Sequence, residues 1–187
     1  MPRAGLTPEA VVDTAINILD AEGVGAVTLA AVASRVGVAA PSLYKHVRNL
    51  DALRRLIAIR IFHELADRLT EVVMGRSRDE ALRELLLAYR RYAIEFPHRY
   101  AALPQAPPND PELAAAGERV VEVIFAVLRG YRLEGEQLVH AARCVRAAAH
   151  GFASLETLGG FGRPESVDAS FDTLIRILTD GLGKGTD

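Results

Sequence analysis

Apolar residues recur at steps of three and four along most of the chain, a spacing typical of helices that pack by one face. The first such stripe consists of Val11, Val12, Ala15, Ile18 and Leu19. Thr7 precedes the stripe as an N-cap, Pro8 suits the first helical position, and Gly23 supplies a stop. The pattern therefore predicts a helix over residues 8–22.

The same reasoning predicts helices over most of the remaining chain. They are expected over 29–36, 39–46, 50–74, 78–96, 111–129, 135–158 and 166–182. Prolines concentrate in residues 97–111, where we expect irregular structure with at most one short helix near 99–103. Because no stretch alternates like a strand, the predicted fold is all-α with about nine helices.

Residues 28–47 carry the parts of a helix-turn-helix in order. Gly37 stands where the turn needs a left-handed backbone, which glycine adopts without a Cβ penalty. The predicted inner face consists of Leu29, Val32, Ala33, Val36, Val38, Leu43 and Val47. Such a motif brings its second helix into the DNA major groove, although two helices joined by a glycine also occur in ordinary bundles. We predict a three-helix, homeodomain-like module over residues 1–50, joined by the long helix to a helical bundle over 51–187.

Charge separates these two parts. The formal charge of the 187 residues is −2, yet residues 28–60 hold six basic side chains against Asp51 alone. A basic module on an acidic body indicates contact with a polyanion at one end. The single Cys144 excludes an intrachain disulfide, and no apolar run is long enough to span a membrane. We therefore expect a cytoplasmic protein that does not bind membranes.

Candidate catalytic and metal chemistry is sparse. The five histidines show no close metal-ligand spacing, so neither a metal site nor a cofactor is predicted. Neither a glycine-rich phosphate loop nor a nucleophile elbow occurs, and Ser154 near Glu156 fits a solvated helix face. The prediction is a protein that is not an enzyme. A small helical enzyme without a recognisable motif remains the alternative hypothesis.

The segment TLAAVASRVGVAAPSLYKHVRNLDALRRLI, residues 28–57, resembles the N-terminal DNA-binding domain of the TetR family of bacterial transcription regulators. The matching positions are Thr28, Ala33, Gly37, Val38, Leu43, Tyr44, His46, Val47 and Leu53. FPHRYAALPQ and AAHGFASLETLGGF resemble one of the C-terminal regulatory domains found in that family. The resemblance implies a ligand-responsive regulator, expected to repress, that binds a near-palindromic double-stranded operator as a homodimer and is released by a small-molecule effector.

The resemblance also assigns DNA contacts to individual residues. They are Arg3, Thr28, Ala39, Ala40, Pro41, Ser42, Tyr44, Lys45 and Arg48. Thr28, Tyr44 and Lys45 would contact phosphates, and residues 39–42 would face the bases. The sequence departs from the family at Val47, where an aromatic is usual, and at Leu50, where a phosphate-binding lysine is common. Arg48 is close enough to supply the phosphate contact that Leu50 cannot make.

The implied C-terminal domain holds a mostly apolar ligand pocket and a dimer interface. Candidate ligand-binding residues are Tyr89, Tyr92, Phe96, Tyr100, Phe125, His140 and Cys144. The aromatic members of this set are equally compatible with an ordinary core. The last two helices are expected to pair across a two-fold axis through Val145, Phe152, Leu155, Phe171, Leu174 and Leu178.

Overall fold

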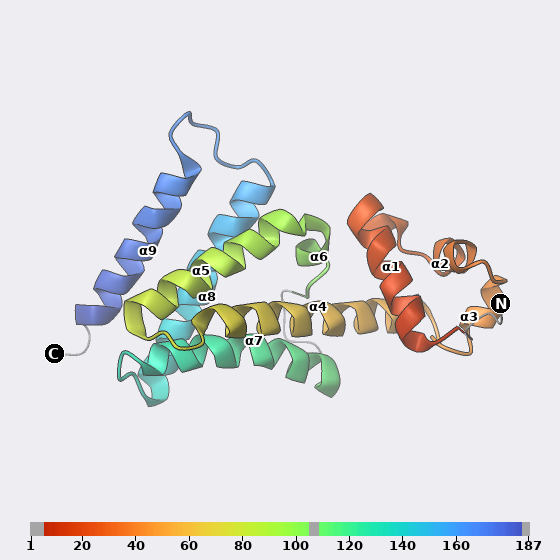
Figure 1. Cartoon of the computed structure of the whole chain (residues 1–187), viewed down its shortest axis with the longest axis horizontal. Coiled ribbons are helices and arrows are strands. Elements are labelled where there is room, and N and C mark those ends of the chain that lie inside the picture. The colour runs from red at the N-terminus through yellow and green to blue at the C-terminus, as the bar shows by residue number, and fades with distance from the viewer. Residues whose placement is uncertain (1–5, 105–108, 185–187) are drawn as a thin grey trace. The chain divides into compact units, whose positions relative to one another are not determined.

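The computed structural model describes residues 6–104 and 109–184, and over these residues the chain is helical with no strand (Figure 1). The elements are α1 Pro8–Glu22, the 3₁₀ turn η1 Val24–Ala26, α2 Leu29–Val36, α3 Ala40–Leu43, α4 Leu50–Val73, α5 Arg78–Glu95, α6 Pro97–Ala101, α7 Pro111–Arg129, α8 Gly135–Thr157 and α9 Val167–Lys184. The predicted all-α fold is confirmed.

The chain divides into two compact units. The first unit holds the described residues up to Ile61 together with Phe96–Ala114. The second unit holds Phe62–Glu95 and the described residues from Ala115 onward. Helix α4 is continuous, so its first half belongs to one unit and its second half to the other.

In the first unit, α1 packs against both α2 and α6 (Figure 1). The Thr7 hydroxyl caps α1 by accepting from the Ala10 N–H at 3.2 Å, as the sequence predicts. The apolar stripe of α1 is buried at every predicted position. Arg99 of α6 donates to Asp20 of α1 through Nε at 2.8 Å and Nη2 at 2.6 Å, so an ion pair reinforces the α1–α6 contact.

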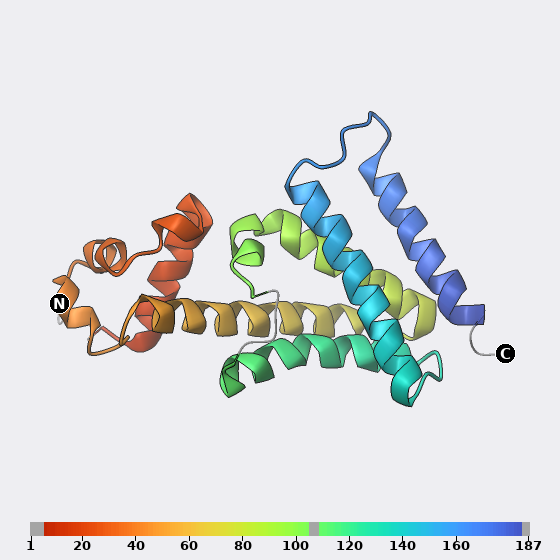
Figure 2. The same ribbon diagram turned by 180° about the vertical axis from the view of Figure 1, so that it is seen from behind.

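In the second unit, α5 packs against α8 and α9, which a loop joins at the top of the view in Figure 2. Leu82, Leu85 and Leu86 of α5 are fully buried. On α8 the buried residues are Ala142, Val145, Ala149 and Ala153. The larger apolar residues Leu138 and Phe152 of this helix are half-buried, and Leu155 is exposed. The buried face of α8 therefore consists of three alanines and one valine.

Candidate nucleic-acid interface

The turn between α2 and α3 has the geometry that the sequence predicts. The Thr28 hydroxyl caps α2 by accepting from the Ala31 N–H at 3.0 Å. Gly37 has φ 72° and ψ 35°, a left-handed conformation. The N–H of Val38 then donates to the Ala33 carbonyl at 3.0 Å and closes the end of α2. These local bonds fix where α3 leaves the turn.

The inner face of the motif is held by four buried apolar residues. Val32 and Ala33 of α2 are buried, and so are Leu43 and Val47 on the α3 side. Three further residues predicted inward, Leu29, Val36 and Val38, are half-buried. Helix α3 is shorter than predicted, but the Val47 N–H donates to the Leu43 carbonyl at 2.9 Å and extends the turn beyond it. Val47 therefore fills the core where the family usually has an aromatic.

The predicted DNA contacts lie on the opposite, outer side of the motif. Thr28, Ala39, Pro41, Tyr44, Lys45 and Arg48 are exposed, whereas Ala40 and Ser42 are half-buried. Tyr44 is 59 % exposed, a large value for an aromatic in a folded domain. Tyr44 is therefore not a packed core residue. Arg3 lies outside the described residues.

Two arginines near the motif form ion pairs with acidic residues that lie far from them in the sequence. Arg35 pairs with Glu22 at 3.1 Å, and Arg60 pairs with Asp13 at 2.7 Å. By contrast, Lys45 and Arg48 form no ion pair with any residue that the structure describes. The charge available on the outer face is therefore concentrated at these two side chains.

Arg55 is held by two acidic residues of this unit. Its Nε donates to Asp110 at 2.6 Å, and its Nη2 also bonds Glu112. The hydrogen bond from Arg55 and the Leu113 N–H lower the pKa of the Asp110 carboxyl below its ordinary value of 3.8. Arg55 therefore joins α4 to the start of α7 and is not available for DNA.

The predicted ligand-binding residues are distributed over both units. Tyr89 and Tyr92 are buried and Phe125 is half-buried in the second unit, while Phe96 and Tyr100 belong to the first. His140 and Cys144 are exposed on α8. These two therefore do not lie among the buried aromatics.

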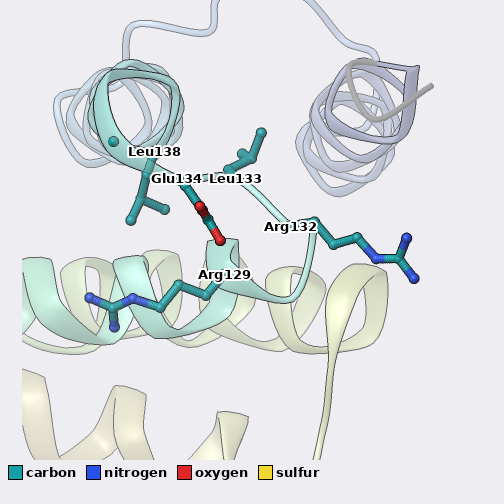
Figure 3. Close-up of a pocket in the computed structure, with 6 residues that line it drawn as sticks. Arg129, Arg132, Leu133, Glu134 and Leu138 are labelled. Atoms are coloured by element: carbon teal, nitrogen blue, oxygen red, sulfur yellow. The ribbon is translucent and has the colours of Figure 1, made fainter.

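A cavity of about 360 Å³ lies at the turn between α7 and α8 (Figure 3). Its lining consists of Arg129, Arg132, Leu133, Glu134, Gly135 and Leu138. None of the predicted ligand-binding residues lines it, and the side chains of Arg129 and Arg132 point away from each other. The geometry does not form an enclosed apolar site.

Arg90 is a central residue that sequence reasoning missed. It is 11 % exposed and bonds Glu156 through Nε at 2.6 Å and through Nη2, which also reaches Asp168 at 2.7 Å. Its guanidinium carbon lies 5.7 Å from the ring centroid of Phe152 and 4.9 Å from that of Phe171. Because these partners lie on α8 and α9, far from Arg90 in the sequence, no local pattern could have indicated the cluster.

The predicted dimer-interface residues occupy different environments. Val145 and Phe171 are buried within the chain itself and offer little surface to a second copy. Phe152, Leu174 and Leu178 are half-buried. Leu155 of α8 is 51 % exposed, and Ile177 of α9, which was not predicted, is 62 % exposed.

No cluster of three or more metal-ligating side chains occurs in the part of the chain that the structure describes. Among the same residues, every helix is too short or too polar to cross a membrane.

Comparison with known proteins decides the family. Residues 11–58 match the family described as bacterial regulatory proteins, tetR family, and residues 82–178 match the tetracyclin repressor-like C-terminal domain. The HTH-type transcriptional regulator Rv0681 of Mycobacterium tuberculosis is 38% identical over 98% of this chain and 84% of its own length. The chain belongs to the TetR family.

A second relative and a solved structure agree with this assignment. YobS of Bacillus subtilis, an HTH-type transcriptional regulator, is 36% identical over 97% of this chain and 95% of its own length. A TetR variant from Acinetobacter baumannii, crystallised with minocycline, superimposes with a TM-score of 0.72 at 21% identity over 98% of this chain and 99% of that one. The structural likeness supports the fold.

Membership establishes the class of protein. TetR-family proteins are DNA-binding transcription factors rather than enzymes, so the alternative of a small helical enzyme is not supported. Family members bind DNA and small-molecule effectors as dimers. This TetR-family chain is a helix-turn-helix transcriptional regulator.

Proposed function

We propose that this regulator represses transcription in the cytoplasm by binding a near-palindromic double-stranded operator as a homodimer. The observation that carries the proposal is the outer face of the α2–α3 motif, where Tyr44, Lys45 and Arg48 are exposed opposite a buried apolar face. Tyrosine hydroxyls and cationic side chains are suited to phosphate oxygens. Thr28 is exposed at the start of α2 and is proposed to contact a phosphate as well. The remaining proposed contacts are Arg3, Ala39, Ala40, Pro41 and Ser42.

A pair of substitutions tests the DNA face. The operator is first obtained by selecting binding sites from random duplex DNA with the full-length protein. Tyr44→Ala combined with Lys45→Ala should weaken binding to the selected duplex at least tenfold, because two phosphate contacts are lost in each half-site. Arg83→Ala serves as the matched control, since Arg83 lies on α5 and pairs with Asp172. Equal affinities of the double variant and the wild type would reject this DNA face.

The proposed dimer places α8 and α9 at a two-fold interface. Support comes from apolar side chains that one chain leaves uncovered, above all Leu155, Leu158 and Ile177. Leu174 and Leu178 are half-buried and lie close to Ile177 along α9. A dimer would set two α3 helices about one DNA turn, roughly 35 Å, apart. The selected duplex should therefore contain two inverted half-sites.

The proposed effector binds the C-terminal helices and lowers the affinity for DNA. The support is that Tyr89, Tyr92 and Phe125 all belong to the second unit and are buried or half-buried there, since small-molecule sites are lined mainly by apolar and aromatic side chains. A ligand with higher affinity for a conformation in which α4 is displaced would favour a spacing of the α3 helices that cannot span adjacent grooves. Phe96, Tyr100, His140 and Cys144 stay predictions without this support.

A further inference from the structure

The part of the motif that faces the bases offers almost no hydrogen-bonding side chains. It consists of Ala39, Ala40, Pro41 and Ser42, at the start of α3. Ala39 and Pro41 are the exposed members, while Ala40 and Ser42 are half-buried. Only Ser42 carries a polar side-chain group. The exposed surface here is therefore made mainly of the methyl group of Ala39 and the ring carbons of Pro41.

The main chain adds few donors to this surface. Pro41 has no N–H, and the Ser42 N–H donates to the Ala39 carbonyl at 2.8 Å. Long polar side chains begin only at Tyr44 and Lys45, which lie beyond the first turn. The arrangement separates a charged rim, suited to phosphates, from an apolar tip.

Major-groove chemistry limits what an apolar tip can recognise. The strongest direct readout uses bidentate contacts from Arg or Lys to guanine and from Asn or Gln to adenine. Residues 39–42 contain none of these four side chains. The 5-methyl group of thymine is the apolar feature on the major-groove edge of the base pairs. It is the group that a methyl and a proline ring can contact favourably.

We propose that Ala39 and Pro41 select operator half-sites by contacting thymine 5-methyl groups. The inference rests on the proposed function, because it assumes that this face enters the major groove. It adds the chemical basis of sequence choice: the motif discriminates by the methyl group rather than by the hydrogen-bonding edge. Burial of one methyl contributes about fourfold in affinity, so two symmetry-related methyls in a dimer site contribute roughly 15-fold.

Base analogues in the selected duplex separate the methyl group from the hydrogen-bonding edge. Uracil keeps every donor and acceptor of thymine and lacks only the methyl group. Replacing the contacted thymine by uracil in both half-sites should weaken binding by about 15-fold. In the converse arm, a duplex with 5-methylcytosine at those positions should bind about 15-fold more tightly than the same duplex with cytosine.

Protein variants assign the effect to the two side chains. In Ala39→Gly combined with Pro41→Ala, the ratio of thymine to uracil affinities should fall from about 15 to near 1. Lys45→Ala is the matched control, because loss of a phosphate contact lowers both affinities and leaves their ratio unchanged.

Two outcomes would overturn the inference, and they are distinct from failure of the proposed function. Tight binding to the selected duplex with equal affinity after uracil replacement at every thymine would show readout without the methyl group. An unchanged thymine-to-uracil ratio in the Ala39→Gly, Pro41→Ala variant would assign the methyl contact to other residues. A protein that selects no duplex at all would instead contradict the proposed function, and the inference with it.

Discussion

At the scale of single residues, a few conformational requirements define the DNA-binding motif. Gly37 has a left-handed backbone at the end of α2, and Thr28 caps the start of the same helix. Both roles follow from local sequence, since caps and positive φ values select particular residue types. The exposure of Tyr44 was not fixed in this way, because aromatics also serve as core residues.

Gly37 supports a prediction about stability. A Cβ added at Gly37 meets no atom within 4 Å, so the substitution causes no clash. Gly37→Ala should lower the unfolding free energy by about 1 kcal/mol, because alanine is strained in the left-handed conformation. Gly25→Ala is the control, because Gly25 also has open space but no left-handed backbone. Thermal unfolding followed by circular dichroism should show a lower melting temperature for Gly37→Ala alone. Equal melting temperatures of the two variants would contradict this account of the turn.

At the scale of elements, helix limits were predictable, whereas contacts between helices were not. The ends of α1, α2 and α7 match the predicted limits, because capping residues and prolines mark them locally. The buried residues of α8 are Ala142, Val145, Ala149 and Ala153, and the many alanines of this helix gave no local signal that marks them as the buried ones. The Arg90–Glu156 pair joins residues far apart in the sequence, and its partners could be known only from the fold.

Arg90 is predicted to hold α5, α8 and α9 together. Arg90→Ala should lower the unfolding free energy by about 2 kcal/mol, because it leaves the mostly covered Glu156 without its cation. Arg83→Ala removes a pair between α5 and α9 that is exposed, and should cost less than about 1 kcal/mol. Chemical denaturation of both variants measures the difference. Equal losses of unfolding free energy in the two variants would mean that the Arg90 ion pairs stabilise the protein no more than an exposed pair does.

The link between α4 and α7 is predicted to weaken in acid. The pKa of Asp110 is lowered in the folded state, so its contribution is present above the ordinary value of 3.8 and is lost as the pH falls through the folded pKa. Asp110→Asn keeps a side chain able to cap α7 but cannot form the ion pair with Arg55. The wild type should therefore melt higher than Asp110→Asn at pH 7, with the difference vanishing in acid. A difference independent of pH would exclude this ion pair as its cause.

At the scale of the whole molecule, the family and fold were predictable from the motif and the helical periodicity, but the dimer surface was only partly so. Leu155→Glu combined with Ile177→Glu should produce monomers, since each charge would be buried in the proposed interface. Both side chains are exposed in one chain, so the monomer should stay folded. Ile94→Glu is the control, because Ile94 is an exposed apolar residue on α5. If light scattering still reports a dimer for the double variant, the interface lies on other residues.

The most direct test of the central claim, that the outer face of α2 and α3 binds DNA phosphates, is the salt dependence of operator affinity. Each phosphate contact contributes about 0.9 to the slope of log affinity against log salt concentration. In a dimer, Lys45→Ala or Arg48→Ala should each make that slope shallower by about 1.8. Arg60→Ala removes the same charge from the same unit but from a pair with Asp13, and should leave the slope unchanged. Wild-type slopes for both Lys45→Ala and Arg48→Ala would contradict the account.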